Sequence, residues 1–259
     1  MNTLMFPTDA GAALRLIYAI GDVHGRDDLL ARLIDDINAD LADLGHSFAQ
    51  RPLLVLLGDY IDRGRQSHLV LDRLIALRES PDFETHVLLG NHEAALLDFI
   101  DGKASGRGWA RFGGRATMES YGVLAPLRDD DDAGWGDARR ALIARIPAGH
   151  MDLLRGMELY LIEQNLLFVH AGIRPGVPLY RQSREDLLGI RGDFLDSTEA
   201  YSHFIVHGHT PVEHPDLRST RLNLDTGAYM TGRLTAVRLD GAFSTFLTTN
   251  ALAEAPSPA

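Results

Sequence analysis

Short apolar runs alternate with longer amphipathic stretches through the first hundred residues. The apolar runs at Leu14–Ile20, Leu53–Leu57 and His86–Leu89 each predict a buried strand. Between them, apolar side chains recur at helical spacing from Leu29 to Leu44 and again from Leu69 to Leu77. Strands and helices that alternate at these distances indicate βαβ units with neighbouring parallel strands, so the expected fold class is α/β.

The pattern changes in the middle of the chain. From about Asp98 to Gly149 the sequence contains both tryptophans, a glycine-rich patch and the acidic run Asp129–Asp132. We interpret this stretch as a mostly helical insert packed over the site, with the acidic run as a solvated loop. Pro147 is expected to open a short helix that contains Leu153 and Leu154.

The remaining sequence predicts mainly strands. A hairpin is expected from Glu158–Ile162 and Leu166–Val169, followed by a loop, a helix and a strand at His203–Val206. An antiparallel group should follow, made of Arg221–Leu224, Leu234–Leu239 and Ala242–Thr248. Residues 1–13 are expected to form a loose leader and 251–259 a disordered tail, which leaves a single domain over 14–250.

Five of the predicted strands end in clusters that combine glycine with acidic, amide or imidazole side chains. The clusters are Gly21–Gly25, Gly58–Gly64, Gly90–Glu93, His170–Gly172 and His207–Thr210. Open α/β sheets carry their sites at the carboxyl ends of their strands. One such cluster would more often be a solvated turn, but five of them predict a shared functional site.

The side chains in these clusters suit divalent cations. Asp22 and His24 lie two positions apart, so in extended backbone both can grip one ion. Carboxylate, imidazole and amide oxygen are ligands for manganese, iron or zinc. Six ligands exceed what one small ion needs if it also holds water, so two ions bridged by Asp59 fit better; the six are Asp22, His24, Asp59, Asn91, His170 and His209. We assign His207 a supporting or structural role.

Composition excludes several other kinds of site. The chain has no cysteine, which rules out disulfides, zinc–thiolate sites and a cysteine nucleophile. Its formal net charge of −11 argues against broad nucleic-acid binding and against an anionic membrane surface, although one phosphate at a metal centre is still compatible. No apolar run is long enough to span a bilayer, and Leu14–Ile20 leads directly into a polar cluster, as a strand would. We therefore expect a cytoplasmic protein.

The motifs GDVHGR, GDYIDRG, GNHE, HAG and HGHTP, in this order, resemble the signature of the calcineurin-like metallophosphoesterases, and more narrowly their phosphoprotein phosphatase branch. The resemblance covers roughly Ile17 to Gly232. It implies two packed mixed β-sheets flanked by helices in a four-layer sandwich. It also implies two divalent ions, manganese before iron or zinc, with one held by Asp22, His24 and Asp59 and the other by Asp59, Asn91, His170 and His209.

The resemblance also implies a mechanism and roles for further residues. A hydroxide bridging the two metals would attack phosphorus in line, without a phosphoenzyme. Arg63 would hold the non-reacting phosphate oxygens, and Arg191 is assigned as the second arginine, although Gly189 stands where an aromatic residue is expected. The alternative for Arg191 is a surface charge on a helix. His92 would be the general acid, oriented and kept cationic by Asp62.

The substrate is less sharply defined. The segments Trp109–Met118, Ser120–Gly122 and Gln182–Leu195 resemble a bacterial subgroup of serine/threonine protein phosphatases, which favours phosphoserine and phosphothreonine, with phosphotyrosine as an extension. Symmetrical diadenosine tetraphosphatases carry a related Gly-Gly segment and are the alternative. A non-catalytic metal-binding regulator is disfavoured by the intact site. Several aromatics could stack an adenine or belong to the insert core, namely Trp109, Phe112 and Tyr121, and Tyr229 is expected to border the site.

Overall fold

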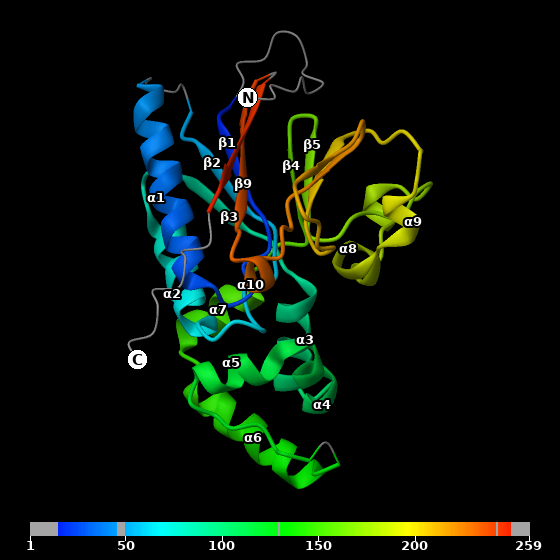
Figure 1. Ribbon diagram of the computed structural model, residues 1–259. Coiled ribbons are helices and arrows are strands. Elements are labelled where there is room, and N and C mark those ends of the chain that lie inside the picture. Colours follow the sequence, from blue (N-terminus) through cyan, green and yellow to red (C-terminus); the bar gives the residue numbers. More distant parts are fainter. Residues whose placement is uncertain (1–14, 46–49, 129, 242, 250–259) are drawn as a thin grey trace, which may run out of the picture.

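The computed structural model describes residues 15–45, 50–128, 130–241 and 243–249. Within these residues the chain forms two five-stranded sheets with helices on their outer sides (Figure 1). The strand orders are β10-β9-β1-β2-β3 and β4-β5-β6-β8-β7. The predicted α/β class with two mixed sheets is confirmed. The expected leader and tail lie outside the described residues.

The first sheet starts with the predicted βαβ units. Strands β1 (Ile17–Ile20), β2 (Leu53–Leu56) and β3 (Glu84–Val87) are parallel. Helices α1 (Asp27–Leu44) and α2 (Ser67–Glu79) connect them. Two C-terminal strands extend the sheet in antiparallel pairing, β9 (Thr235–Asp240) against β1 and β10 (Phe243–Thr248) against β9. The first strand begins at Ile17, later than predicted.

The second sheet contains the predicted hairpin of β4 (Tyr160–Glu163) and β5 (Leu166–Val169). Strands β6 (Phe204–His207) and β8 (Arg221–Asn223) continue it in parallel, and the short β7 (Asp216–Leu217) pairs antiparallel with β8. The prediction that Arg221–Leu224 joins the last two strands in an antiparallel group was therefore wrong. This strand belongs to the second sheet, and its own residues carry no signal for which sheet it joins.

The faces of the strands divide the core into layers. Alternate residues of β1 and β2, such as Ile17, Ala19 and Val55, pack against Phe168 and Val206 of the second sheet. The residues between them, such as Tyr18 and Leu54, pack under the helices. Helices α8 (Arg184–Gly189) and α9 (Gly192–Leu195) cover the outer face of the second sheet. Burial on both faces explains why the strands read as continuous apolar runs.

A group of helices lies beyond the carboxyl ends of the parallel strands (Figure 1). It includes α3 (Asn91–Ile100), α4 (Gly106–Trp109), α5 (Arg115–Ser120), α6 (Asp132–Arg145) and α7 (Ala148–Arg155). The segment Ala110–Gly114 joins α4 to α5 and is broken at Gly113, which has φ 116°. Helix α7 begins directly after Pro147, as predicted, and a single 3-10 turn covers Leu179–Arg181.

The acidic run does not remain a loop throughout. Asp131 caps α6 by accepting a hydrogen bond from the Gly134 N–H at 2.8 Å, and Asp132 is the first residue of the helix. Acidic side chains stabilise helix N-termini, where they offset free N–H groups and the helix dipole. The loop interpretation was therefore wrong for Asp132, whereas Asp131 is an exposed residue that precedes the helix. Asp129 lies outside the described part of the chain.

Candidate metal centre

The predicted site residues converge where strands of both sheets end. Asp22 and His24 follow β1, Asp59 follows β2, and Asn91 begins α3 after β3. From the second sheet, His170 follows β5 and His209 follows β6. The parallel order of the strands brings these loops to one edge, as the sequence predicted.

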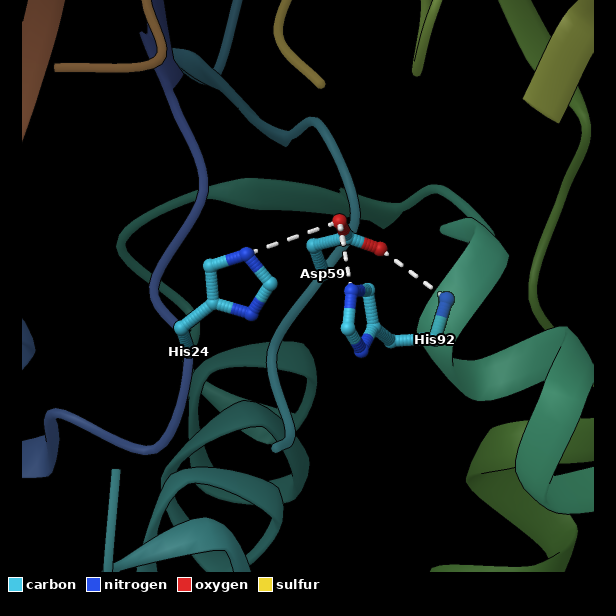
Figure 2. A group of neighbouring side chains, drawn as sticks. All are labelled: His24, Asp59 and His92. Atoms are coloured by element: carbon cyan, nitrogen blue, oxygen red, sulfur yellow. Dashed lines mark hydrogen bonds and ion pairs between the residues drawn. The ribbon is translucent and has the colours of Figure 1, made fainter. Parts of the chain in front are cut away.

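One group of side chains surrounds Asp59 on the side of the first sheet (Figure 2). Asp59 Oδ2 lies 3.6 Å from His24 Nε2 and 3.8 Å from His92 Nε2, and all three residues are buried. The other ring nitrogen of His24, Nδ1, lies 3.0 Å from the Ile61 carbonyl oxygen, to which it can only donate. Its Nε2 therefore carries a lone pair directed toward Asp59, as a metal ligand requires.

A second group uses the other oxygen of the same carboxylate. His170 Nε2 lies 3.4 Å from Asp59 Oδ1 and 3.0 Å from Asn91 Oδ1, while its Nδ1 contacts the Leu57 carbonyl oxygen at 2.8 Å. The His209 ring is centred 5.0 Å from that of His170. Asp59, His170 and His209 form one cluster of potential ligand atoms within 4.8 Å, and His24, Asp59 and His92 form the other. Asp59 is thus shared by both.

The residues present fit divalent cations. Both ring nitrogens of His209 are buried without a hydrogen-bond partner, which is costly unless another ligand satisfies one of them. Burial lowers the pKa of His24 and of His209 to about 3, so both imidazoles are neutral and available for coordination. The donor set contains only nitrogen and oxygen, which suits borderline and hard ions.

Buried acids concentrate negative charge around these histidines. Burial and the nearby Asp225 raise the pKa of Asp22 well above its usual range. Burial would also raise the pKa of Asp59, but His170, His92 and His24 outweigh it and hold that pKa well below normal. In return Asp59 overcomes the effect of burial on His170 and raises its pKa to about 10. Bound cations would take over the charge balance that these protons now provide.

Asp22 occupies a different position from the other predicted ligands. It lies in neither cluster, and its carboxylate accepts the backbone N–H of His209 at 3.2 and 3.1 Å. Gly208 makes this approach possible, because a Cβ at that position would collide with Asp22 Oδ1. The contact links the loop after β1 to the loop after β6. Coordination by Asp22 stays a prediction.

His92 and Arg63 lie beside the first cluster. His92 Nδ1 is 2.6 Å from Asp62 Oδ2. Burial lowers the pKa of His92, but the charges of Asp59 and Asp62 outweigh burial and leave this pKa above its usual value. The Arg63 guanidinium lies 3.2 Å from His92 Nε2 and 4.5 Å from the centre of the Tyr229 ring. Tyr229 also contacts the His24 ring at 5.2 Å, so it borders the site as expected.

Arg191 reaches the rim from the second sheet. It precedes α9 and is exposed, with Nη1 3.3 Å from Thr210 Oγ1 and Nη2 3.4 Å from the His209 carbonyl oxygen. Arg63 and Arg191 thus contact residues of opposite clusters. His207 is fully buried with its ring 5.1 Å from that of Phe194, which matches a structural role.

Backbone strain is concentrated in these loops. Among the described residues, six that are not glycine adopt positive φ, and five of them belong to the site: His24 (47°), Asp59 (53°), Asp62 (71°), Arg63 (68°) and His209 (67°). The left-handed region costs such residues free energy and persists where the surrounding structure enforces it. The strand-end loops are therefore shaped for the placement of these side chains.

Two acidic residues that hold the loops of this site were given no role in the sequence analysis. Glu93 is fully buried and accepts hydrogen bonds from the backbone N–H groups of Gly90, Asp59, Tyr60 and Ile61. It thereby holds the loop that carries Asp59, and burial together with Asp59 raises its pKa to about 7. Asp225 is buried beside the centre and caps the Gly227 N–H. Glu93 lies in the GNHE motif that the sequence analysis singled out, but residue type alone does not reveal these backbone contacts.

The calcineurin-like phosphoesterase family model matches residues 15–233. The chain belongs to the calcineurin-like phosphoesterases. This match covers every strand-end cluster that forms the centre.

Two bacterial relatives of this phosphoesterase are dinucleotide hydrolases by name. The asymmetrical bis(5'-nucleosyl)-tetraphosphatase of Anoxybacillus flavithermus is 29% identical over 203 residues, which cover 71% of this chain and 74% of that protein. A symmetrical bis(5'-nucleosyl)-tetraphosphatase of an Acidovorax species is 32% identical over 210 residues, 79% of this chain and 60% of the relative. The family and these relatives identify a metal-dependent phosphoester hydrolase.

Solved structures confirm the fold of the phosphoesterase. A crystal structure described as a putative diadenosine tetraphosphatase has a TM-score of 0.61 at 16% identity and covers 96% of this chain and 99% of its own. A cold-active protein-tyrosine phosphatase of a Shewanella species has a TM-score of 0.53 at 19% identity, covering 91% of this chain and 80% of its own. In the described part of the chain, every helix is too short or too polar to cross a bilayer.

Proposed function

We propose that the chain hydrolyses phosphomonoesters at a centre of two divalent cations and that its substrates are phosphorylated proteins. The observation that carries the dinuclear centre is the Asp59 carboxylate, whose two oxygens face separate imidazole clusters. Two carboxylate oxygens directed to different ligand sets suit a pair of ions better than a single one. The buried His209 ring also favours bound cations, because both of its nitrogens lack a hydrogen-bond partner and burying them unpaired is costly.

The ligands are assigned to two ions. Asp22, His24 and Asp59 would hold the first, and the second would be held by Asp59, Asn91, His170 and His209. We propose manganese as the native metal ahead of iron or zinc, given the mixture of oxygen and nitrogen donors. When bound, the ions would lower the pKa of water to yield a nucleophile near neutral pH and offset the charge of the phosphate.

Arg63 and Arg191 would hold the non-reacting phosphate oxygens. A planar guanidinium suits this task because it donates two parallel hydrogen bonds. In the present arrangement the Arg63 guanidinium faces His92 Nε2 at 3.2 Å, and since it can only donate, Nε2 accepts. Arg63 must therefore turn toward a bound phosphate before Nε2 can carry a proton. His92 would then protonate the leaving oxygen, with Asp62 holding its other nitrogen.

Two observations bear on the substrate. The insert segment that resembles protein phosphatases lies at the site, because the Gly113 carbonyl oxygen accepts the backbone N–H of Arg63 at 3.2 Å. Of the aromatics considered for adenine stacking, Trp109 is buried and Tyr121 is hydrogen-bonded to His150, whereas Phe112 is 66% exposed. The names of the relatives favour dinucleoside polyphosphates, which are therefore the second candidate substrate.

Turnover measured side by side would separate the candidates. With added Mn²⁺ we expect phosphate release from phosphoserine and phosphothreonine peptides to exceed hydrolysis of diadenosine tetraphosphate in kcat/KM. A strong preference for the dinucleotide would replace the first candidate by the second, and its products would tell symmetrical cleavage, two ADP, from asymmetrical cleavage, ATP and AMP. Absence of metal-dependent hydrolysis with both substrates would overturn the proposed function itself.

A further inference from the structure

The Asp62 carboxylate is held by the helical insert. Asp62 is fully buried, and its carboxylate accepts three hydrogen bonds: from Thr117 Oγ1 to Oδ1 at 2.6 Å, from Trp109 Nε1 to Oδ2 at 2.8 Å, and from His92 Nδ1 to Oδ2 at 2.6 Å. Trp109 ends α4 and Thr117 lies in α5, so two of the three donors come from outside the strand-end loops.

Thr117 grips both the side chain and the backbone of Asp62. Its single hydroxyl proton goes to Asp62 Oδ1, and its oxygen accepts the Asp62 backbone N–H at 2.8 Å. Ser67 Oγ, 3.0 Å from the same oxygen, can donate its own proton there. Asp62 adopts φ 71°, a conformation that a non-glycine residue keeps only under such constraint. The Asp62 carboxylate therefore has one orientation, with Oδ2 toward His92.

The geometry of the insert brings both donors to this point. Gly113 and Gly114 lie between Trp109 and Thr117 in the sequence. A Cβ on Gly114 would collide with the Trp109 ring, and the φ of 116° at Gly113 breaks the helical path while its carbonyl oxygen accepts the Arg63 N–H. The Trp109 ring packs 5.5 Å from that of Phe99 in α3, the helix that carries His92. Indole, carboxylate and imidazole are thus fixed as one unit.

We propose that Trp109 and Thr117 are positioning residues for the proton transfer from His92. By holding Asp62, they keep Oδ2 on His92 Nδ1–H, which directs Nε2 toward the leaving oxygen. As the bond from phosphorus to that oxygen breaks, its electron pair takes the Nε2 proton. Water supplies the new oxygen on phosphorus and releases one proton to solvent, and the imidazole recovers a proton from solvent. This inference rests on the proposed function, because it requires an ester with a leaving group.

Kinetics with two leaving groups test the proposal. Thr117→Val keeps the shape of the side chain and removes its hydroxyl. It should lower kcat for phenyl phosphate, a poor leaving group, by about tenfold or more, and kcat for p-nitrophenyl phosphate by no more than about twofold, with KM unchanged. Thr117→Ser should restore both rates to within about twofold of the wild type, and Trp109→Phe should act in the same direction as Thr117→Val.

Thr249→Val is a matched control. Thr249 is equally buried, and its hydroxyl likewise accepts a backbone N–H, from Leu234 at 2.9 Å. Its hydroxyl also donates to the Gly232 carbonyl oxygen, so these hydrogen bonds go to residues outside the metal centre. This variant should keep both rates. Equal losses on the two substrates in Thr117→Val, or failure of Thr117→Ser to restore the selective loss, would overturn the proposal.

Proton NMR of the metal-depleted protein gives a readout that does not depend on turnover. The proton between His92 Nδ1 and Asp62 Oδ2, two atoms that lie 2.6 Å apart, should give a slowly exchanging downfield resonance that is assigned by its loss in His92→Asn. Thr117→Val and Trp109→Phe should shift or broaden this resonance, whereas Thr249→Val should not. An unchanged resonance in both site variants, or its absence in the wild type, would contradict the proposal. A normal NMR result in a protein without phosphoesterase activity would instead remove the proposed function.

Discussion

At the scale of single residues, backbone carbonyls decide which histidine nitrogen faces the centre. His24 Nδ1 contacts the Ile61 carbonyl oxygen and His170 Nδ1 contacts that of Leu57, at 3.0 and 2.8 Å. Because a carbonyl accepts only, both Nδ1 atoms carry hydrogen and both Nε2 atoms are directed to Asp59. His92 differs, since its Nδ1 contacts the Asp62 carboxylate, whose negative charge favours the cationic ring that an acid needs. The same residue type is thus prepared for two tasks.

The acid role of His92 predicts a selective kinetic loss. His92→Asn removes the proton donor, so turnover of phenyl phosphate should fall by about 100-fold or more, while p-nitrophenyl phosphate, whose leaving group needs little protonation, should lose much less. Steady-state kinetics with both esters measure this directly. His203→Asn, at a half-buried histidine beside Ser202, serves as the control and should retain both rates. Proportionate losses in His92→Asn would remove the acid assignment.

His207 predicts a dependence of stability on pH. Burial, and next the charge of Arg221, lower its pKa from 6.5 to about 3. The folded protein therefore favours the neutral ring, so the stabilisation is complete above pH 6.5 and is lost as the pH falls toward 3. Between pH 7 and pH 5 the free energy of unfolding should decrease by about 2 kcal/mol more in the metal-free wild type than in His207→Leu. Urea denaturation at the two pH values tests this, and an equal decrease in the free energy of unfolding in the wild type and in His207→Leu would contradict it.

At the scale of elements, the ends of the strands require residues without side chains. Gly208 follows β6 at the point where the Asp22 carboxylate approaches, and Gly90 allows the same close approach of Asp59. A glycine here is required by the neighbouring element and not by its own turn. In these two clusters the glycine next to Asn91 or His209 is thus explained by the approach of Asp59 or Asp22.

Gly208→Ala should displace Asp22. If Asp22 is a ligand, the affinity for Mn²⁺ should fall about 10- to 100-fold, because even residues that only orient ligands have effects of this size. Isothermal titration of the purified protein measures the affinity. Gly189→Ala is the matched control, since a Cβ there meets no atom within 4 Å and the residue ends α8. Wild-type affinity in Gly208→Ala would show that the close contact with Asp22 has no bearing on the metal.

The elements also show what the sequence could and could not predict. Periodicity predicted the βαβ start and the hairpin, because burial on a helix face or on both sheet faces leaves a local pattern. It misplaced Arg221–Leu224 and missed β7, since pairing partners are chosen by contacts distant in sequence. The sequence predicted which side chains meet around Asp59. For the same reason that it missed β7, it did not reveal that Glu93 holds the loop of Asp59 or that Trp109 and Thr117 hold Asp62.

At the scale of the whole molecule, the centre joins two sheets. Asp22, His24, Asp59 and Asn91 come from the first sheet, and His170 and His209 from the second. In the protein alone, the contact between the sheets at this edge relies on hydrogen bonds such as those from His209 to Asp22 and on the attraction between His170 and Asp59. Bound cations would add direct bonds between the sheets, so metal binding and global stability should be coupled.

Metal should therefore raise the stability of the fold through Asp59. A ligand that binds only the folded protein, at a concentration of 100 Kd, stabilises it by about 2.7 kcal/mol for each site. We expect Mn²⁺ to raise the free energy of unfolding accordingly, EDTA to reverse the gain, and Asp59→Asn to lose most of it because that carboxylate serves both clusters.

Asp27→Asn is the control: Asp27 is also buried but pairs with Arg73 at 2.6 and 2.9 Å on the outer helices. It should lower stability with and without Mn²⁺ while keeping the full increment. Thermal and urea unfolding with and without Mn²⁺ measure both quantities, and an undiminished increment in Asp59→Asn would mean that the two clusters do not share this residue.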